Sequence, residues 1–178
     1  MKKLSDSELI VIQELFRNPK AELIDLKELL EKTVSRPTRT KKGTVDVRSV
    51  SKFKSVGFKK IREGLEKLAN DFRLDYSLQA DTDEEKEKEA ILYRNGILIG
   101  HDFRIDRKIT FFYSSKEESI IPWQDHLCNL KCEEECSKIL KQIRLEHGLE
   151  SLNAKPPYRD HFELTINEIT EREIKKNV

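Results

Sequence analysis

The stretch SVGFKKIREGLEKLANDF, residues 55–72, mixes apolar residues with lysine, arginine and glutamate at the period of an α-helix. Four apolar residues recur along it at spacings of four, three and four: Ile61, Leu65, Leu68 and Phe72. This spacing predicts one buried face, because residues three and four apart share a side of a helix. We therefore expect a helix from about Val50 to Phe72, with most of its basic residues off the buried face. A break in this helix is expected near Gly57.

Two shorter helices are predicted before it. The sequence SDSE, residues 5–8, has the spacing of a capping box, and apolar residues at helical spacing follow it. A second helix is predicted from about Ala21 to Lys32, with its leucines on one side. The basic segment 34–49 contains Pro37 and Gly43 and is expected to be a loop.

The rest of the chain predicts strands and one more long helix. Asn95-Gly96, within AILYRNGILIG, is the pair preferred in type I′ turns, so a β-hairpin is expected there. Another strand is predicted over 106–114, with Ile109, Phe111 and Tyr113 on one face. The remaining expectations are a solvated acidic loop over 79–89, a linker over 119–123, a helix over 125–148 and a strand followed by a helix over 160–174. Together these elements predict an α+β fold.

Charge is strongly segregated along a chain that is nearly neutral overall. The 178 residues are 38% charged, with a formal net charge of +1. Between Arg36 and Arg62 there are ten basic residues and one acid, whereas residues 63–89 hold ten acids and four bases. The basic block is the first candidate for a surface that binds a polyanion.

The order of two helices, a basic helix and a hairpin resembles the winged helix-turn-helix family of DNA-binding proteins. The residues that carry this resemblance are LIDLKELLEKT (23–33) and SVGFKKIREGLEKLANDFRLDYSL (55–78). It implies a winged-helix-like DNA-binding domain over 1–113 and a helical, cysteine-containing region over 114–178. In this family the third helix enters the major groove and the wing contacts the flanking backbone. The chain departs from the pattern in two ways, since about 17 residues link the second and third helices and an acidic segment precedes the expected wing.

The resemblance assigns the groove-facing positions to Lys52, Lys54, Ser55, Lys59, Lys60 and Arg62, and the charge pattern adds Arg36, Arg39, Lys41, Lys42 and Arg48. Lysine and arginine bind duplex DNA by neutralising phosphates and releasing counterions. The expected partner is therefore double-stranded DNA, and the resemblance also implies a homodimer. The alternative is that these charges coat an ordinary solvated helix.

All three cysteines lie in HLCNLKCEEEC, residues 126–136. An odd, clustered set argues against a disulfide framework and indicates a reducing compartment. A helix that starts near residue 129 would let His126, Cys128, Cys132 and Cys136 bind tetrahedral Zn²⁺, and an iron–sulfur cluster is the alternative. The other interpretations are a buried core stripe or a redox-active thiol set without metal. Three-cysteine elements of this kind are similar to those of some archaeal transcriptional regulators.

The sequence also limits the function. No stretch approaches 18 consecutive apolar residues, so no membrane span is expected and we expect a cytoplasmic protein. There is no P-loop, G-x-S-x-G or H-E-x-x-H motif, and we expect no enzyme activity unless His101, Asp102 and Asp106, which lie near Lys108 in the sequence, line a pocket. His147 is expected to be an imidazolium that caps a helix. The predicted function is a DNA-binding transcriptional regulator that responds to metal or redox state. The alternative is a non-catalytic module that binds RNA or an acidic protein, with structural cysteines.

Overall fold

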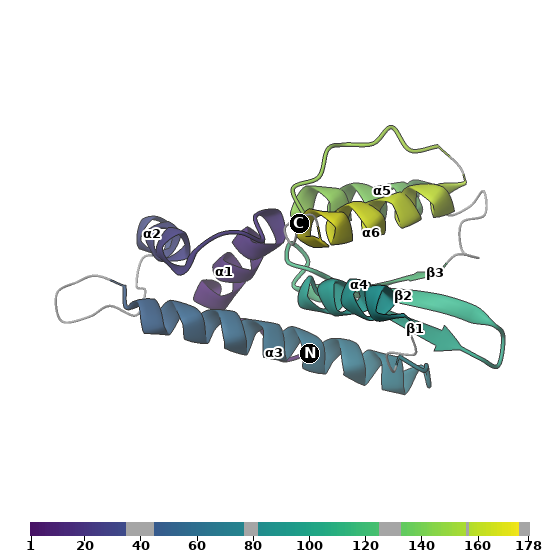
Figure 1. Cartoon of the computed structure of the whole chain (residues 1–178), viewed down its shortest axis with the longest axis horizontal. Helices are drawn as coiled ribbons and strands as arrows, with labels where there is room; N and C mark the ends of the chain where they lie inside the picture. The colour runs from purple at the N-terminus through teal and green to yellow at the C-terminus, as the bar shows by residue number, and fades with distance from the viewer. Residues whose placement is uncertain (35–44, 77–81, 125–132, 156, 175–178) are drawn as a thin grey trace.

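A three-stranded antiparallel sheet lies between two layers of helices in this α+β protein (Figure 1). The computed structural model describes residues 1–34, 45–76, 82–124, 133–155 and 157–174. Its elements are α1 (Asp6–Arg17), α2 (Leu23–Thr33), α3 (Val47–Asp71), α4 (Asp83–Arg94), β1 (Ile97–Asp102), β2 (Arg107–Ser114), β3 (Ser119–Gln124), α5 (Glu133–Glu146) and α6 (Tyr158–Ile174). Within these ranges, no helix is both long and apolar enough to cross a bilayer.

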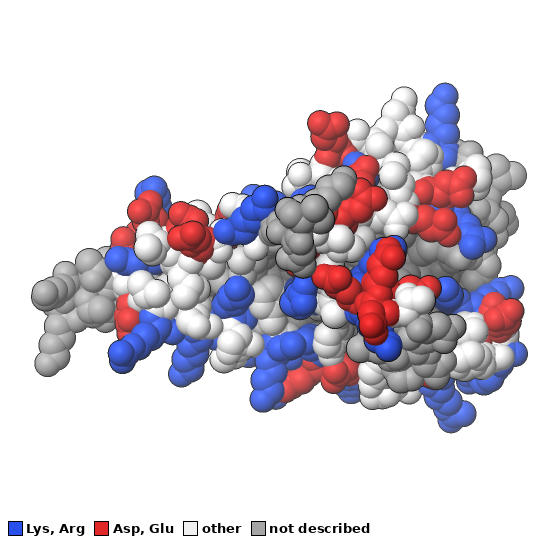
Figure 2. Space-filling view, in the orientation of Figure 1, with Lys and Arg blue, Asp and Glu red and all other residues white. Residues whose placement is uncertain are grey.

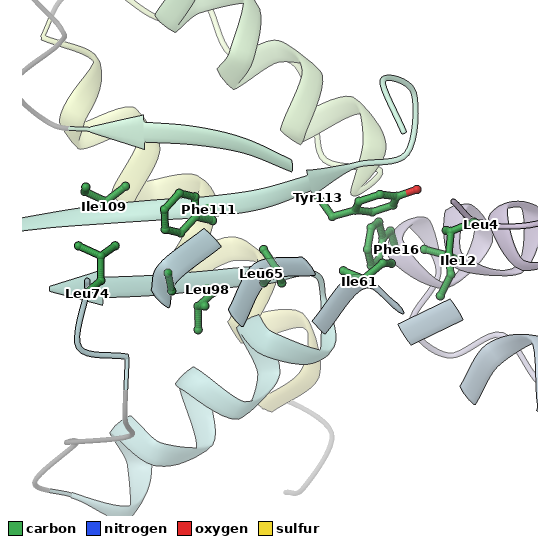
Figure 3. Packing of buried hydrophobic residues seen from close by; sticks show 11 residues of the cluster. Leu4, Ile12, Phe16, Ile61, Leu65, Leu74, Leu98, Ile109, Phe111 and Tyr113 are labelled. Atoms are coloured by element: carbon green, nitrogen blue, oxygen red, sulfur yellow. The ribbon is translucent and has the colours of Figure 1, made fainter. Parts of the chain in front are cut away.

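One face of the sheet packs on α3 and α1 (Figure 3). Ile61 and Leu65 are fully buried there, as the helical spacing predicts. Phe72 was expected on the same face but is 42% exposed. Ala69, four residues after Leu65, takes the next buried place, and α3 ends at Asp71, so Phe72 lies past the last turn.

Gly57 lies inside α3 without breaking it, so the expected break is wrong. A Cβ at this position would lie 3.1 Å from Ile12 Cγ1 of α1. The glycine therefore permits a close approach of the two helices, whose packing stabilises the helix against its low intrinsic propensity. Beyond this contact, Val11 of α1, Leu26 of α2 and Val50 of α3 form a smaller core that joins the three helices.

The other face of the sheet packs on α5 and α6. The indole of Trp123 stacks on the ring of Phe162, with centroids 3.8 Å apart. Residues 119–123 were expected to be a linker, but they form the edge strand β3, which pairs with β2. Pro122 is compatible with an edge strand because its missing N–H is not needed for a further ladder. The boundary expected after residue 113 falls inside β2, and β3 continues the same sheet.

The Asn95-Gly96 pair ends a helix instead of closing a hairpin. α4 begins at a capping box, in which Thr82 Oγ1 accepts from the amide of Glu85, so the part of the expected loop that the structure describes is helical from Asp83 onward. Asn95 is the C-cap of α4, and Gly96 has a φ of +75°. A positive φ is required both after a helix C-terminus and in a type I′ turn, which explains the wrong prediction. The observed hairpin joins β1 to β2 through residues 103–106.

The two C-terminal helices were only partly predicted. α5 lies within the expected helix over 125–148, of which residues 125–132 are outside the described part. α6 is helical throughout, so the strand expected at its start is wrong. Its buried residues include Phe162, Thr165 and Ile169, and this spacing of three and four is helical. The capping box of α1 is confirmed: Ser5 Oγ accepts from the amide of Glu8, and the Glu8 carboxylate accepts from the amide of Ser5.

Candidate nucleic-acid interface

A row of polar residues follows the side of α3 that faces away from both cores. Its members recur at spacings of four, three, four and three, and we call them the α3 stripe: Arg48, Lys52, Ser55, Lys59 and Arg62. The stripe extends over about 21 Å, at 1.5 Å per residue. Figure 2 shows lysine and arginine side chains along the lower edge of the molecule, where α3 runs in Figure 1.

The N-terminal part of this surface carries the most available positive charge. Arg48, Lys52 and Lys54 are exposed, and no described residue forms an ion pair with any of the three. The first turn of α3 contains no acidic residue, and its N-cap, Asp46, accepts from the amide of Arg48 at 3.0 Å. Because the Asp46 carboxylate compensates the partial positive charge of this helix N-terminus, the positive charge here comes from the three side chains.

Toward the middle of α3 the basic side chains contact other parts of the protein. Lys59 Nζ lies 3.9 Å from Glu63. Lys60 lies on a different side of the helix, with its Nζ 2.7 Å from Glu8 of α1, and is only 22% exposed. The guanidinium of Arg62 lies over the ring of Tyr93, 5.8 Å from its centroid. Lys60 is therefore held by α1, away from the surface of the stripe.

A shallow groove of about 500 Å³ runs beside the stripe. Its basic and hydroxyl side chains are Ser51, Lys54, Ser55 and Arg62 from α3 and Arg94 from α4, and Glu173 is its one lining acid among the described residues. The groove therefore extends the positive surface toward the junction of α3 and α4. The acidic start of α4 does not cover the N-terminal part of α3, because α4 packs on β1 and α6 (Figure 1).

Four of the expected nucleic-acid contacts, Arg36, Arg39, Lys41 and Lys42, lie outside the described residues. The same is true of three of the four expected metal ligands, His126, Cys128 and Cys132. The fourth, Cys136, is buried on α5 in the core that contains Leu140 and Ile143. No group of three or more metal-binding side chains occurs within the described ranges. Zinc or an iron–sulfur cluster stays a prediction, which elemental analysis of anaerobically purified protein tests.

The residues considered for catalysis lie at the hairpin between β1 and β2. Asp102 accepts from Arg104 Nε at 2.8 Å and from its Nη2 at 2.7 Å, and these hydrogen bonds hold the pKa of Asp102 below its usual value. Arg104 Nη2 also donates to the carbonyl of Phe72, and His101 Nε2 lies 3.0 Å from Asp106 Oδ1. These contacts close the turn and anchor it to the end of α3.

His147 differs from its expected role as an imidazolium cap. It is buried, and its ring stacks on Phe16 with centroids 4.9 Å apart. Burial, followed by the charge of Arg172, lowers the pKa of His147 to about 3. The imidazole is therefore neutral at pH 7, because the cost of burying its charge exceeds the attraction of the helix C-terminus.

The contacts that hold Lys60 and Arg62 against other parts of the protein could not be predicted from the sequence. Glu8 has the spacing of a capping residue, and nothing in that spacing indicates its ion pair with Lys60, 52 residues away. Tyr93 was expected in a strand, although it donates to Glu66 and lies beneath Arg62. No protein-family model, curated protein or solved structure matches this chain.

Proposed function

We propose that this protein binds double-stranded DNA through the N-terminal half of α3 and acts as a transcriptional regulator. The observation that carries the proposal is that Arg48 and Lys52 are exposed and unpaired within the described residues, on the far side of a helix whose inner side is buried. Lys54 is exposed and unpaired there too, on the side of the helix that lines the groove. A helix fits the major groove of B-DNA, and exposed lysine and arginine side chains on such a helix neutralise phosphates. The response to metal or redox state depends on residues 126–136 and stays a prediction.

Salt titration of binding to a random DNA duplex tests the proposal. Replacing Arg48, Lys52 and Lys54 with alanine removes three phosphate contacts. The slope of log K against log salt is then expected to become shallower by roughly 3, because each contact contributes about 0.9. Binding is measured by fluorescence anisotropy of a labelled duplex.

A second triple variant provides the matched control. It removes the same charge from exposed positions on and after α5, on the opposite side of the sheet from α3: Lys138, Lys141 and Lys155. The control is expected to retain most of the wild-type salt slope. Equal losses in the two variants would contradict a specific surface on α3. Tighter binding to an RNA hairpin or an acidic protein than to DNA would favour an interaction module.

A further inference from the structure

A cavity of about 370 Å³ lies between the C-terminal half of α3, α4 and β1. This volume is within the range of small-molecule sites. Its walls are mainly apolar and come from Ala90, Leu92, Ile97, Leu98, Ile99 and the tyrosines Tyr76 and Tyr93. Neither the packing of the sheet nor the α3 stripe accounts for a cavity of this size at this place.

The charged groups that line the cavity are two carboxylates and one guanidinium. The guanidinium, of Arg94, is paired with Glu173 of α6 at 3.3 Å. The first carboxylate, of Glu66, accepts a hydrogen bond from the hydroxyl of Tyr93. The second, of Glu89, accepts no hydrogen bond and forms no ion pair within the described part of the chain, so no neighbouring cation directly neutralises it.

The pKa of Glu89 agrees with this description. Burial, followed by the charge of Glu85, raises it, and the charge of Lys108 offsets this only in part. A carboxylate with a raised pKa is one whose negative charge is incompletely compensated by its surroundings. A positive group in the cavity would compensate it.

We propose that this cavity binds a small organic cation, an amine that carries an aromatic or short aliphatic group. Tyrosine rings attract ammonium groups through their negative faces, and the carboxylates of Glu66 and Glu89 provide ion pairs. Arg62 already lies over Tyr93, so Tyr76 is the ring assigned to the ligand cation. The apolar wall from β1 accommodates the rest of the ligand. An anionic ligand of the same shape is repelled by the same carboxylates. The proposal is independent of DNA binding.

Three probes of similar shape and different charge test the proposal on the full chain: 2-phenylethylamine, 2-phenylethanol and 3-phenylpropionate. Affinities are measured at pH 7 by isothermal titration calorimetry and by saturation-transfer NMR. The amine is expected to bind at least about tenfold more tightly than the alcohol, and the carboxylate is expected not to bind. Equal affinity for the amine and the alcohol, or no binding of any probe, would overturn the proposal.

Variants locate the site. Glu89→Gln is expected to weaken amine binding by about tenfold. Glu87→Gln, which removes the same charge from an exposed position two residues away on α4, is expected to change it less than twofold. Ala90→Phe fills the cavity without changing its charge and is expected to abolish binding while thermal unfolding remains cooperative. If Glu89→Gln has no effect, or if Glu87→Gln has the same effect, the cation is not held in this cavity.

Discussion

Two sets of polar side chains in this protein have opposite surroundings. The first is a polar cluster where α5 meets α6, α1 and the end of β2, made of the buried Arg144, Glu146 and His147 and the partly buried Arg172. The second is the N-terminal part of the α3 stripe, where Arg48 and Lys52 are exposed and have no ion-pair partner among the described residues. A charged side chain therefore indicates function only when it is not one of the charges that hold the fold together.

Arg144 and Glu146 of the α5–α6 cluster are hydrogen-bonded within the protein, whereas His147 Nδ1 and Arg172 Nε have no hydrogen-bond partner among the described residues. Arg144 is 3% exposed, and its Nη2 lies 2.8 Å from Glu168 while its Nε donates to the carbonyl of Glu150. Glu146 accepts from the hydroxyl of Ser114 and from the amide of Ser115, both at 2.6 Å. Such buried groups are costly to disturb, since a partner left behind keeps its desolvation penalty.

Arg144→Ala is expected to produce the largest loss of stability. It removes a buried guanidinium and leaves Glu168 and the carbonyl of Glu150 without this donor, so the free energy of unfolding should fall by about 3 kcal/mol. Urea denaturation followed by circular dichroism measures the change. Lys141→Ala, an exposed position on the same helix, is the control and should change stability by less than about 0.5 kcal/mol. Similar values for both variants would remove the distinction between buried and exposed charges.

His147 makes stability dependent on pH. Its pKa is about 3 in the folded protein and about 6.5 when exposed, so only the unfolded chain binds this proton between those values. The contribution of the neutral imidazole is fully present above pH 6.5 and is lost as the pH falls below it. From pH 7 to pH 5 the loss should be about 2 kcal/mol. Denaturation of wild type and His147→Gln at both pH values measures it, and an unchanged pH dependence in the variant would be the contrary result.

The Glu8–Lys60 pair joins α1 to α3 and, like the α5–α6 cluster, stabilises the fold, although Lys60 is part of the basic block. Burial raises the pKa of Glu8, but hydrogen bonds from Lys60 and from the amide of Ser5 outweigh burial and lower it overall. Its stabilisation is therefore present above about pH 4.5 and is lost as the pH falls through the lowered value.

Glu8→Gln tests this pair. Glutamine keeps the capping box, so the expected loss of about 1.5 kcal/mol at pH 7 reports the charge alone. The difference between wild type and variant should shrink when unfolding is measured in acid. A difference that stays constant with pH would show that the carboxylate charge is not what stabilises the contact.

Local signals in the sequence predicted the elements that are specified locally. The capping box of α1, the buried positions Ile61 and Leu65 and the strand over 106–114 have short-range patterns that the fold keeps. The hairpin predicted at Asn95-Gly96 was wrong because a positive φ is needed both at a helix end and in a hairpin turn. The linker predicted over 119–123 was wrong because an edge strand that contains proline has the composition of a linker.

The candidate site shows a different limit. Ten basic residues in one block were predicted as one surface, but a charge count cannot tell which of them are held by distant residues. Lys60 is held by Glu8 of α1, and Arg62 lies against Tyr93 of α4. Both contacts join segments far apart in the chain, and no local pattern encodes them.

The smallest expected change in stability comes from Lys52→Ala, and it gives the sharpest contrast with Lys60→Ala. Lys52 is exposed and unpaired within the described residues, so its removal should change the free energy of unfolding by less than about 0.5 kcal/mol. It should nevertheless make the salt slope of duplex binding shallower by about 1. Lys60→Ala should do the reverse, with a clear loss of stability and an unchanged salt slope, because its ammonium is already neutralised by Glu8. If both lysines changed the salt slope equally, the ion pair with Glu8 would have to open on binding, and the division between structural and available charge would not hold for this helix.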